Sequence, residues 1–383
     1  MSALPDRAEV VVVGGGVMGT SIAFHLAEAG VEVCLLERDE LASGSTSRAA
    51  GGIRAQFSDP LNVAIGLRSI EAFTRFGERP GAEIDLAQVG YLFLLDREED
   101  VSVFEKSVAL QNGLGVPSRF VPLDEVHELC PLAGLDGVLA ATTCPLDGHA
   151  SPEAVVQGYA AAARRLGATV LTHCAARGIS LRGREVAAVA TDRGTVSTGT
   201  VVCAAGVWSP ALARAVGLEL PVEPILREVG FTGPVEGLPS RIPLTIDFST
   251  GFYFHREGPG ILFGMADREQ PPGLDTPTDP AWLERVLAVA ERRAPALLDL
   301  GIAGGWKGAY EVTPDANALV GETLDVHRFL YATGFSGHGF LQGPAIGEIV
   351  RDLVLGRAPF VDVAPLSVER FARDTPRPEH NVV

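Results

Sequence analysis

The stretch VVVVGGGVMGTSIAFHLAEAGVEVCLLER, residues 10–38, decides the fold of this chain. It begins with a β-branched run that meets a glycine cluster. Residues 20–29 then show helical periodicity, and a second apolar run covers residues 31–36. Strand, tight turn, helix and strand in this order make a βαβ unit. The sequence therefore predicts an α/β fold that opens with two parallel strands.

The glycine cluster has the spacing of a dinucleotide-binding turn. Gly14, Gly16 and Gly19 lie between the strand and the helix, where backbone N–H groups at a helix N-terminus can bind phosphate. Glu37 ends the second strand, about twenty residues further on, where a carboxylate can accept hydrogen bonds from a ribose. The alternative is a plain strand–helix turn with Glu37 as a surface carboxylate.

Length and composition limit the class of protein. A chain of 383 residues suits about two domains. Its 48 acidic and 31 basic side chains give a net charge of −17, which disfavours nucleic acid and anionic membranes as partners. The five cysteines form no CxxC pair, and the N-terminus lacks an apolar signal region. We expect a cytoplasmic protein with reduced cysteines, no membrane span and no metal site.

The order of the predicted elements indicates two lobes. An apolar strand at 90–96 breaks the βαβ rhythm, and a proline-initiated helix at 151–166 restores it. The chain leaves the first lobe again in a second segment, which contains short strands between 226 and 265 and a helix at 282–293. It returns with a strand at 327–333, which precedes a helix that Pro344 would start. The predicted nucleotide-binding domain comprises 1–80, 145–222 and 322–372, the substrate domain comprises 81–144 and 223–321, and 373–383 is a loose tail.

Five separated blocks resemble the D-amino-acid-oxidase-like flavoproteins, within them the branch of sarcosine oxidase β-subunits and dimethylglycine dehydrogenase-like proteins. The blocks are VVVGGGVMG with Glu37-Arg38, SGSTSRAAGGIRAQFS at 43–58, VVCAAGVWSP at 201–210, WKGAYEVTPD at 306–315 and GFSGHGFLQGPAIG at 334–347. The resemblance implies a glutathione-reductase-like Rossmann domain that binds FAD, with a second β-rich (α+β) substrate domain.

The resemblance also implies which residues contact the cofactor. They lie in the glycine turn, at the end of the second strand, in the hydroxyl-rich loop and in the last blocks. The predicted FAD-binding residues are Gly14, Gly16, Val17, Met18, Gly19, Glu37, Arg38, Ser45, Thr46, Ser47, Gly51, Ala176, Ala205, Gly206, Trp208, Gly334, Gly337, Gly339, Phe340 and Leu341. The flavin-bearing cysteine of relatives aligns near Gly308, so we expect FAD to be held without a covalent bond.

Arg54 is the predicted catalytic-site anchor, because sarcosine-oxidase-like enzymes clamp the substrate carboxylate with an arginine just after this loop. A guanidinium fork matches a carboxylate. Arg227 and Arg256 are rival anchors. His338 could tune the flavin or position an amine, or be a loop histidine satisfied by the backbone, and Tyr253 could cap the substrate or pack in the core.

The chain departs from its relatives at three positions. Tyr310 stands where glycine- and D-amino-acid-oxidase relatives carry a carboxylate-binding arginine, so simple D-amino acids are disfavoured as substrates. Leu341 and Leu262 align with lysines of monomeric sarcosine oxidases, and the latter lysine assists oxygen. A dye or a partner protein is therefore the expected electron acceptor, with Lys307 and protonated His338 as the remaining cations that could assist oxygen.

These features predict FAD-dependent oxidation of a C–N bond in a small secondary amine or N-methyl amino acid. Hydride would pass to flavin N5, and the resulting imine would hydrolyse. Two alternatives stay open: oxidation of a cyclic or carrier-bound amino acid, and a catalytically quiet FAD-bound assembly subunit. The expected partners are the small-molecule substrate and an electron-acceptor protein or partner subunit.

Overall fold

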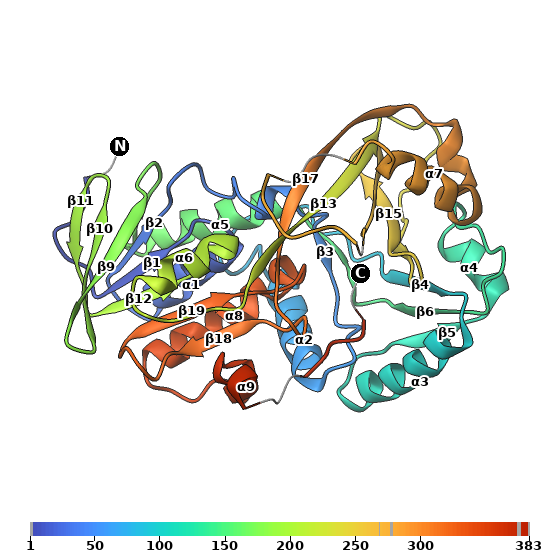
Figure 1. Ribbon diagram of the computed structural model, residues 1–383. Helices are drawn as coiled ribbons and strands as arrows, with labels where there is room; N and C mark the ends of the chain where they lie inside the picture. The colour runs from blue at the N-terminus through green and yellow to red at the C-terminus, as the bar shows by residue number, and fades with distance from the viewer. Residues whose placement is uncertain (1–2, 268, 276–278, 374–376, 382–383) are drawn as a thin grey trace.

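A computed structural model describes residues 3–267, 269–275, 279–373 and 377–381. The chain forms two lobes that lie side by side (Figure 1). Each lobe is built around one large sheet, and the strands of each sheet come from separate parts of the chain. No described helix is both long and apolar enough to cross a membrane.

The first lobe contains a six-stranded sheet in the order β18-β19-β12-β1-β2-β8. Its neighbouring strands are parallel except for the antiparallel pair β18–β19. The strands are β1 (Val10–Val13), β2 (Val33–Leu36), β8 (Thr169–Leu171), β12 (Thr200–Cys203), β18 (Leu319–Glu322) and β19 (Phe329–Thr333). β1, β2, β12 and β19 are buried along their whole length because both faces of the sheet are covered.

Helices cover one face of this sheet and a small antiparallel sheet covers the other. The helical layer packs α1 against α5 and α8, and α8 against α2. The opposite apolar cluster joins residues of β1 and β2 to the small sheet and α6. The elements are α1 (Val17–Glu28), α2 (Pro60–Thr74), α5 (Pro152–Arg165), α6 (Ser209–Arg214), α8 (Gly339–Val354), β9 (Ala176–Arg182), β10 (Glu185–Thr191) and β11 (Gly194–Ser197). This arrangement confirms the predicted α/β class.

The second lobe contains an eight-stranded sheet in the order β17-β13-β16-β15-β14-β4-β6-β5. Its strands are β4 (Tyr91–Leu95), β5 (Arg119–Val121), β6 (Ala140–Cys144), β13 (Glu223–Thr232), β14 (Leu244–Asp247), β15 (Phe252–Glu257), β16 (Gly260–Met265) and β17 (Ile302–Val312). Its helices are α3 (Glu98–Gly113), α4 (Leu123–Leu129) and α7 (Trp282–Arg293). The remaining short elements are β3 (Gly52–Ile53), β7 (Gly148–His149), α9 (Glu369–Ala372) and the 3-10 turns η1 (Thr46–Arg48), η2 (Gly206–Trp208), η3 (Pro295–Asp299) and η4 (Ala364–Leu366).

The last long helix does not start where the sequence predicts. α8 begins at Gly339, with His338 as its N-cap, and Pro344 lies inside the helix. A proline in a helix removes one backbone hydrogen bond and usually ends the helix. Here α8 is buried almost throughout and packs on α1 and α2, so tertiary contacts keep it continuous. The positive end of α8 therefore lies in the segment 337–341 and not at Pro344.

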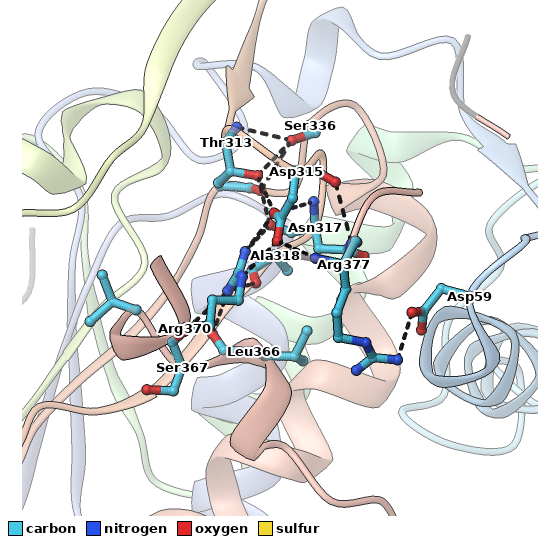
Figure 2. Close-up of polar contacts among 12 residues, drawn as sticks. Asp59, Thr313, Asp315, Asn317, Ala318, Ser336, Leu366, Ser367, Arg370 and Arg377 are labelled. Carbon is cyan, nitrogen blue, oxygen red and sulfur yellow. Dashed lines mark hydrogen bonds and ion pairs between the residues drawn. The ribbon is translucent and has the colours of Figure 1, made fainter. Parts of the chain in front are cut away.

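The expectation of a loose tail is wrong for residues 377–381, the part of the tail that the structure describes. Arg377 donates to Asp59 Oδ2 at 2.6 Å and its backbone N–H donates to Asp315 Oδ2 at 3.3 Å (Figure 2). Glu379 and Asn381 are buried. A proline-rich charged segment is normally solvated, but here its charged groups find buried polar partners in the first lobe.

Candidate functional site

A continuous cavity lies between the two large sheets. Its lining includes residues 13–18, 36–38 and 204–206, which lie at or just after the carboxyl ends of β1, β2 and β12. The carboxyl ends of parallel strands meet at one edge of a sheet, the usual ligand position in such folds. The other wall comes from the second lobe and includes Arg227 and Tyr253.

The glycine turn leaves its backbone open to a ligand. Gly14 has a φ of +118°, and a Cβ on it would lie 2.2 Å from the Ala204 carbonyl oxygen. A Cβ on Gly19 would lie 1.8 Å from the Gly14 carbonyl oxygen, so Gly19 allows helix and strand to pack closely. Gly16, the N-cap of α1, has no side chain that could occupy the N–H groups of the helix, and it lines the cavity. A glycine turn at the positive end of a helix suits the diphosphate of FAD.

Glu37 lies directly against this turn. Its Oε2 accepts from the Gly15 N–H at 2.6 Å, and its Oε1 accepts from the Asp39 N–H at 2.8 Å. Both bonds fix the carboxylate at the cavity wall, where it could also accept a hydroxyl hydrogen. Next to it, the Arg38 guanidinium stacks 3.8 Å from the centre of the Trp208 ring.

The hydroxyl-rich loop joins the two lobes. Ser45 Oγ donates to the Ala309 carbonyl oxygen of β17 at 2.6 Å, and Thr46 Oγ1 accepts from the Val17 N–H at 3.2 Å. Both residues line the cavity. Ser45 thus ties the loop to the second sheet, while Thr46 occupies one N–H donor of α1.

Most of the predicted FAD-binding residues share this cavity. Those that line it are Gly14, Gly16, Val17, Met18, Glu37, Arg38, Ser45, Thr46, Gly51, Ala176, Ala205, Gly206, Trp208, Gly337, Gly339, Phe340 and Leu341. Gly19, Ser47 and Gly334 lie outside the described lining. At Gly334 the φ is +72° and a Cβ would lie 2.5 Å from Thr313 Cγ2, so backbone geometry and packing require this glycine.

The wall from the second lobe presents phenols. Tyr253, Tyr310 and Tyr91 line the cavity, and burial raises the pKa of each phenol. They therefore stay protonated and can donate hydrogen bonds to a ligand. A Cβ on Gly337 would lie 2.4 Å from the Tyr310 ring, so this glycine lets the α8 turn approach the second sheet.

Arg54 is buried at the cavity wall, with 3% of its surface exposed. Its Nη2 donates to the Asn381 carbonyl oxygen at 2.5 Å and lies 3.2 Å from His338 Nε2, and its Nη1 donates to the Gln56 carbonyl oxygen. No carboxylate of the described residues lies within ion-pair distance of Arg54. Burial lowers its pKa, although the more distant charge of Glu379 opposes this shift.

His338 is neutral in this environment. Burial first, and then the positive charge of Arg54, lower the pKa of the imidazole to about 3. Its ring edge packs on Phe57, with the ring centres 5.1 Å apart. The shift in pKa and the Arg54 guanidinium 3.2 Å from Nε2 both favour the uncharged imidazole, which disfavours assistance of oxygen by protonated His338.

Of the other basic residues that the sequence analysis considered, one faces the cavity and two do not. Arg227 faces the cavity and donates through Nη1 to the Asp267 carbonyl oxygen at 2.8 Å, while its buried Nε has no acceptor among the described residues. Arg256 donates to the carbonyl oxygens of Gly258 and Pro239 and is absent from the described lining, which favours Arg54 and Arg227 over it as a substrate anchor. Lys307 pairs with Glu228 at 3.0 Å.

The two leucines that replace family lysines are both buried. Leu341 lines the cavity, whereas Leu262 has 2% of its surface exposed and is absent from the described lining. In the sheet, Leu262 pairs with His255 and Phe231. The described lining thus presents a leucine rather than an ammonium group at 341.

Two carboxyl groups at or near the site, half-buried Glu311 in the cavity lining and buried Asp147, were not predicted from the sequence. Glu311 accepts from Thr333 Oγ1 at 2.7 Å and from the Gly334 N–H at 3.0 Å, and burial raises its pKa. Asp147 accepts from the Ala55 N–H at 2.9 Å, and burial raises its pKa to about 7. An acid inside the strand-like block 306–315 was the available signal for Glu311; Asp147 lies in no recognisable pattern.

Comparisons with known proteins agree with this geometry. The chain is 29% identical to mouse dimethylglycine dehydrogenase over 97% of its length, and 29% identical to the 4-methylaminobutanoate oxidase of Paenarthrobacter nicotinovorans over 96%. It spans 45% and 46% of these longer proteins. The crystal structure of L-proline dehydrogenase from P. horikoshii superposes with a TM-score of 0.93 at 35% identity, covering 98% of this chain and all of that one.

A family match covers nearly the whole chain. Residues 9–353 match the family described as DAO, FAD dependent oxidoreductase. The match spans both large sheets and the cavity between them. The chain therefore belongs to the DAO family of FAD-dependent oxidoreductases.

Proposed function

We propose that this protein oxidises the C–N bond of a small secondary amine or N-methyl amino acid. FAD, when bound, supplies the hydride acceptor for the carbon next to nitrogen. The resulting imine is hydrolysed by water to a carbonyl compound and an amine. An electron-acceptor protein then removes the electrons, and the cofactor is held without a covalent bond.

The observation that carries this proposal is the buried guanidinium of Arg54, which faces the cavity without a carboxylate partner in the described structure. A buried cation of this kind is costly unless an anion compensates it. A substrate carboxylate would supply that charge and place the amine against the phenols of Tyr253 and Tyr310. Holding the reacting atoms in place accounts for a large part of the rate in such reactions.

A proline-like substrate is the second candidate. The likeness to an L-proline dehydrogenase covers 98% of this chain and all of that protein, whereas the match to the longer N-methyl amino acid enzymes covers only 45% and 46% of their length. In a cyclic amino acid, the secondary amine and the carboxylate have a fixed spacing. A pocket with one buried anchor and rigid phenol walls would suit such a ligand.

An anaerobic screen tests the function directly. The FAD-loaded protein is mixed with sarcosine, dimethylglycine, 4-methylaminobutanoate, proline and amines without a carboxylate, and loss of the oxidised flavin absorbance is followed. We expect at least one carboxylated secondary or tertiary amine to bleach the flavin within seconds. No bleaching by any amine would favour the quiet assembly subunit instead.

Substitution of Arg54 tests the anchor. Arg54→Lys should raise KM for the bleaching substrate by about 10- to 100-fold, because an ammonium cannot reproduce the two-pronged contact. Arg227→Lys is the matched comparison, since Arg227 faces the same cavity from β13. A larger effect at Arg227 would transfer the anchor role to that residue. Equal kinetics for a substrate and its decarboxylated analogue would exclude both.

A further inference from the structure

Residues 377–381 form a strap that lies against the first lobe and ends at Arg54. We call this segment the C-terminal strap. The last described part of the chain, drawn in red, runs between the two lobes (Figure 1). None of the strap residues belongs to the described cavity lining, yet the Asn381 carbonyl oxygen accepts from Arg54 Nη2 at 2.5 Å. The strap therefore contacts the predicted anchor without lining the cavity.

Glu379 fastens the strap to the start of α2. Its carboxylate accepts from the Ser58 N–H at 2.8 Å, from Ser58 Oγ at 2.6 Å, from the Asp59 N–H at 3.2 Å and from Asn62 Nδ2 at 3.0 Å. It also accepts from the Asn381 N–H at 2.9 Å, inside the strap. Burial pushes the pKa of Glu379 upward, but these hydrogen bonds outweigh burial and lower it. Glu379 is thus a buried, ionised carboxylate with a complete set of donors.

A second fastening lies two residues earlier in the chain. Arg377 reaches Asp59 Oδ2 at 2.6 Å, and its backbone N–H donates to Asp315 Oδ2 (Figure 2). Asp315 is itself held by Arg370, whose Nε and Nη2 donate to its two oxygens at 2.8 Å each. The strap is therefore held at both 377 and 379 before it reaches Arg54.

The strap also brings a negative charge near the anchor without pairing with it. Arg54 has only neutral acceptors within hydrogen-bond distance among the described residues, namely the carbonyl oxygens of Gln56 and Asn381 and the ring of His338. The negative charge of Glu379 acts on both Arg54 and His338. A guanidinium held by fixed carbonyl groups on one side keeps its remaining N–H donors in one orientation, which prepares it for a ligand.

We propose that Glu379 is a positioning residue for substrate binding: by fastening the C-terminal strap, it places the Asn381 carbonyl group that orients Arg54 toward the substrate carboxylate. This inference rests on the proposed function. It assigns a specificity role to a residue that does not line the cavity and lies 325 positions after Arg54 in the chain (379 − 54).

The test compares Glu379→Ala with His380→Ala in FAD-loaded protein. The His380 side chain is exposed, and only its backbone N–H holds the strap, by donating to Ser58 Oγ. The ligand probes are pyrrole-2-carboxylate and its neutral carboxamide, measured by calorimetry. Hydrogen exchange of the peptide containing 379–381 reports independently on the strap.

We expect Glu379→Ala to speed exchange in the strap and to raise Kd for pyrrole-2-carboxylate by about tenfold or more, the scale expected from a misplaced charged contact. Kd for the carboxamide should change less than about twofold. Glu379→Asp should recover part of the affinity, and His380→Ala should match wild type. When a substrate that the enzyme oxidises is used instead of the ligand probe, Glu379→Ala should raise KM while kcat changes little.

Arg377→Met loosens the same strap at its other fastening and guards against a folding defect at Glu379. It should raise Kd for the carboxylate in the same direction. A strap that exchanges fast in either variant while Kd for the carboxylate stays within twofold of wild type would overturn the inference. Wild-type protein that binds no carboxylate and oxidises no amine would instead overturn the proposed function, and this inference with it.

Discussion

At the scale of single residues, Glu37 has a structural role, and we propose that it also binds the ligand. Its two oxygens hold the Gly15 and Asp39 N–H groups, which sets the carboxylate at the cavity wall. Glu37→Ala should weaken FAD binding by about 1–3 kcal/mol, the cost of leaving a charge-assisted partner unpaired. Fluorescence titration of the apoprotein with FAD measures this. Glu40→Ala is the control, because exposed Glu40 pairs with His173; equal losses in both variants would mean that Glu37 makes no specific contact.

Asp147 gives a prediction about pH. Burial raises its pKa to about 7, against about 3.9 in an unfolded chain. Between these values the folded state binds the extra proton, so this group makes the protein less stable as pH rises from about 4 to 7, with no further change above that range. Asp147→Asn removes the effect while keeping an acceptor for the Ala55 N–H.

Urea unfolding at pH 5 and pH 8 measures the difference. Relative to wild type, the Asp147→Asn variant should gain roughly 2–3 kcal/mol more unfolding free energy at pH 8 than at pH 5, from the linkage of one proton to folding. All other titrating groups are common to both proteins and cancel in this double difference. A pH-independent difference between the two proteins would show that Asp147 ionises normally.

At the scale of elements, local sequence patterns predicted the helices and strands whose formation depends on residues close together in the chain. The βαβ unit and α7 (Trp282–Arg293) follow from periodicity, and the residues after β1, β2 and β12 lie in the cavity because they follow parallel strands. The start of α8 could not be predicted, because burial of the whole helix outweighs the local effect of Pro344. The prediction relied on the preference of proline for the first turn of a helix, and the packing of α8 outweighs that preference.

The features that the sequence analysis missed depend on contacts between elements that are far apart in the chain. Tyr91 faces the cavity only because β4 pairs with β14 in one register, and no local pattern contains that register. The C-terminal strap has the composition of a solvated tail, yet Glu379 finds five donors, four of them from the start of α2. Such partners are visible only once the chain is folded. The same holds for Lys307, which β17 directs to Glu228.

At the scale of the whole molecule, the cavity lies between the lobes and is lined by both. Bound FAD should therefore contact both lobes and hold them together. Its walls come from the glycine turn, from the loop that Ser45 ties to Ala309, and from the second sheet at Arg227. A ligand that bridges these walls binds the folded state and not the unfolded chain. By mass action it then stabilises folding by about 2.7 kcal/mol at a free concentration of 100 times Kd.

We therefore expect Tm to rise with added FAD, and flavin to appear in the supernatant after acid or heat denaturation. The described lining contains no cysteine and one histidine, His338, whose Nε2 lies against Arg54. Each tenfold increase in free FAD above Kd should add about 1.4 kcal/mol, a shift of a few degrees for a domain of this size. Riboflavin, which lacks the diphosphate, should give a much smaller shift, and Gly16→Val should abolish the shift with FAD because a side chain there meets Thr46 and fills the diphosphate space. Flavin that stays with the precipitated polypeptide, together with a Tm that ignores added FAD, would show a covalent bond instead and would point to His338 as the first residue to map.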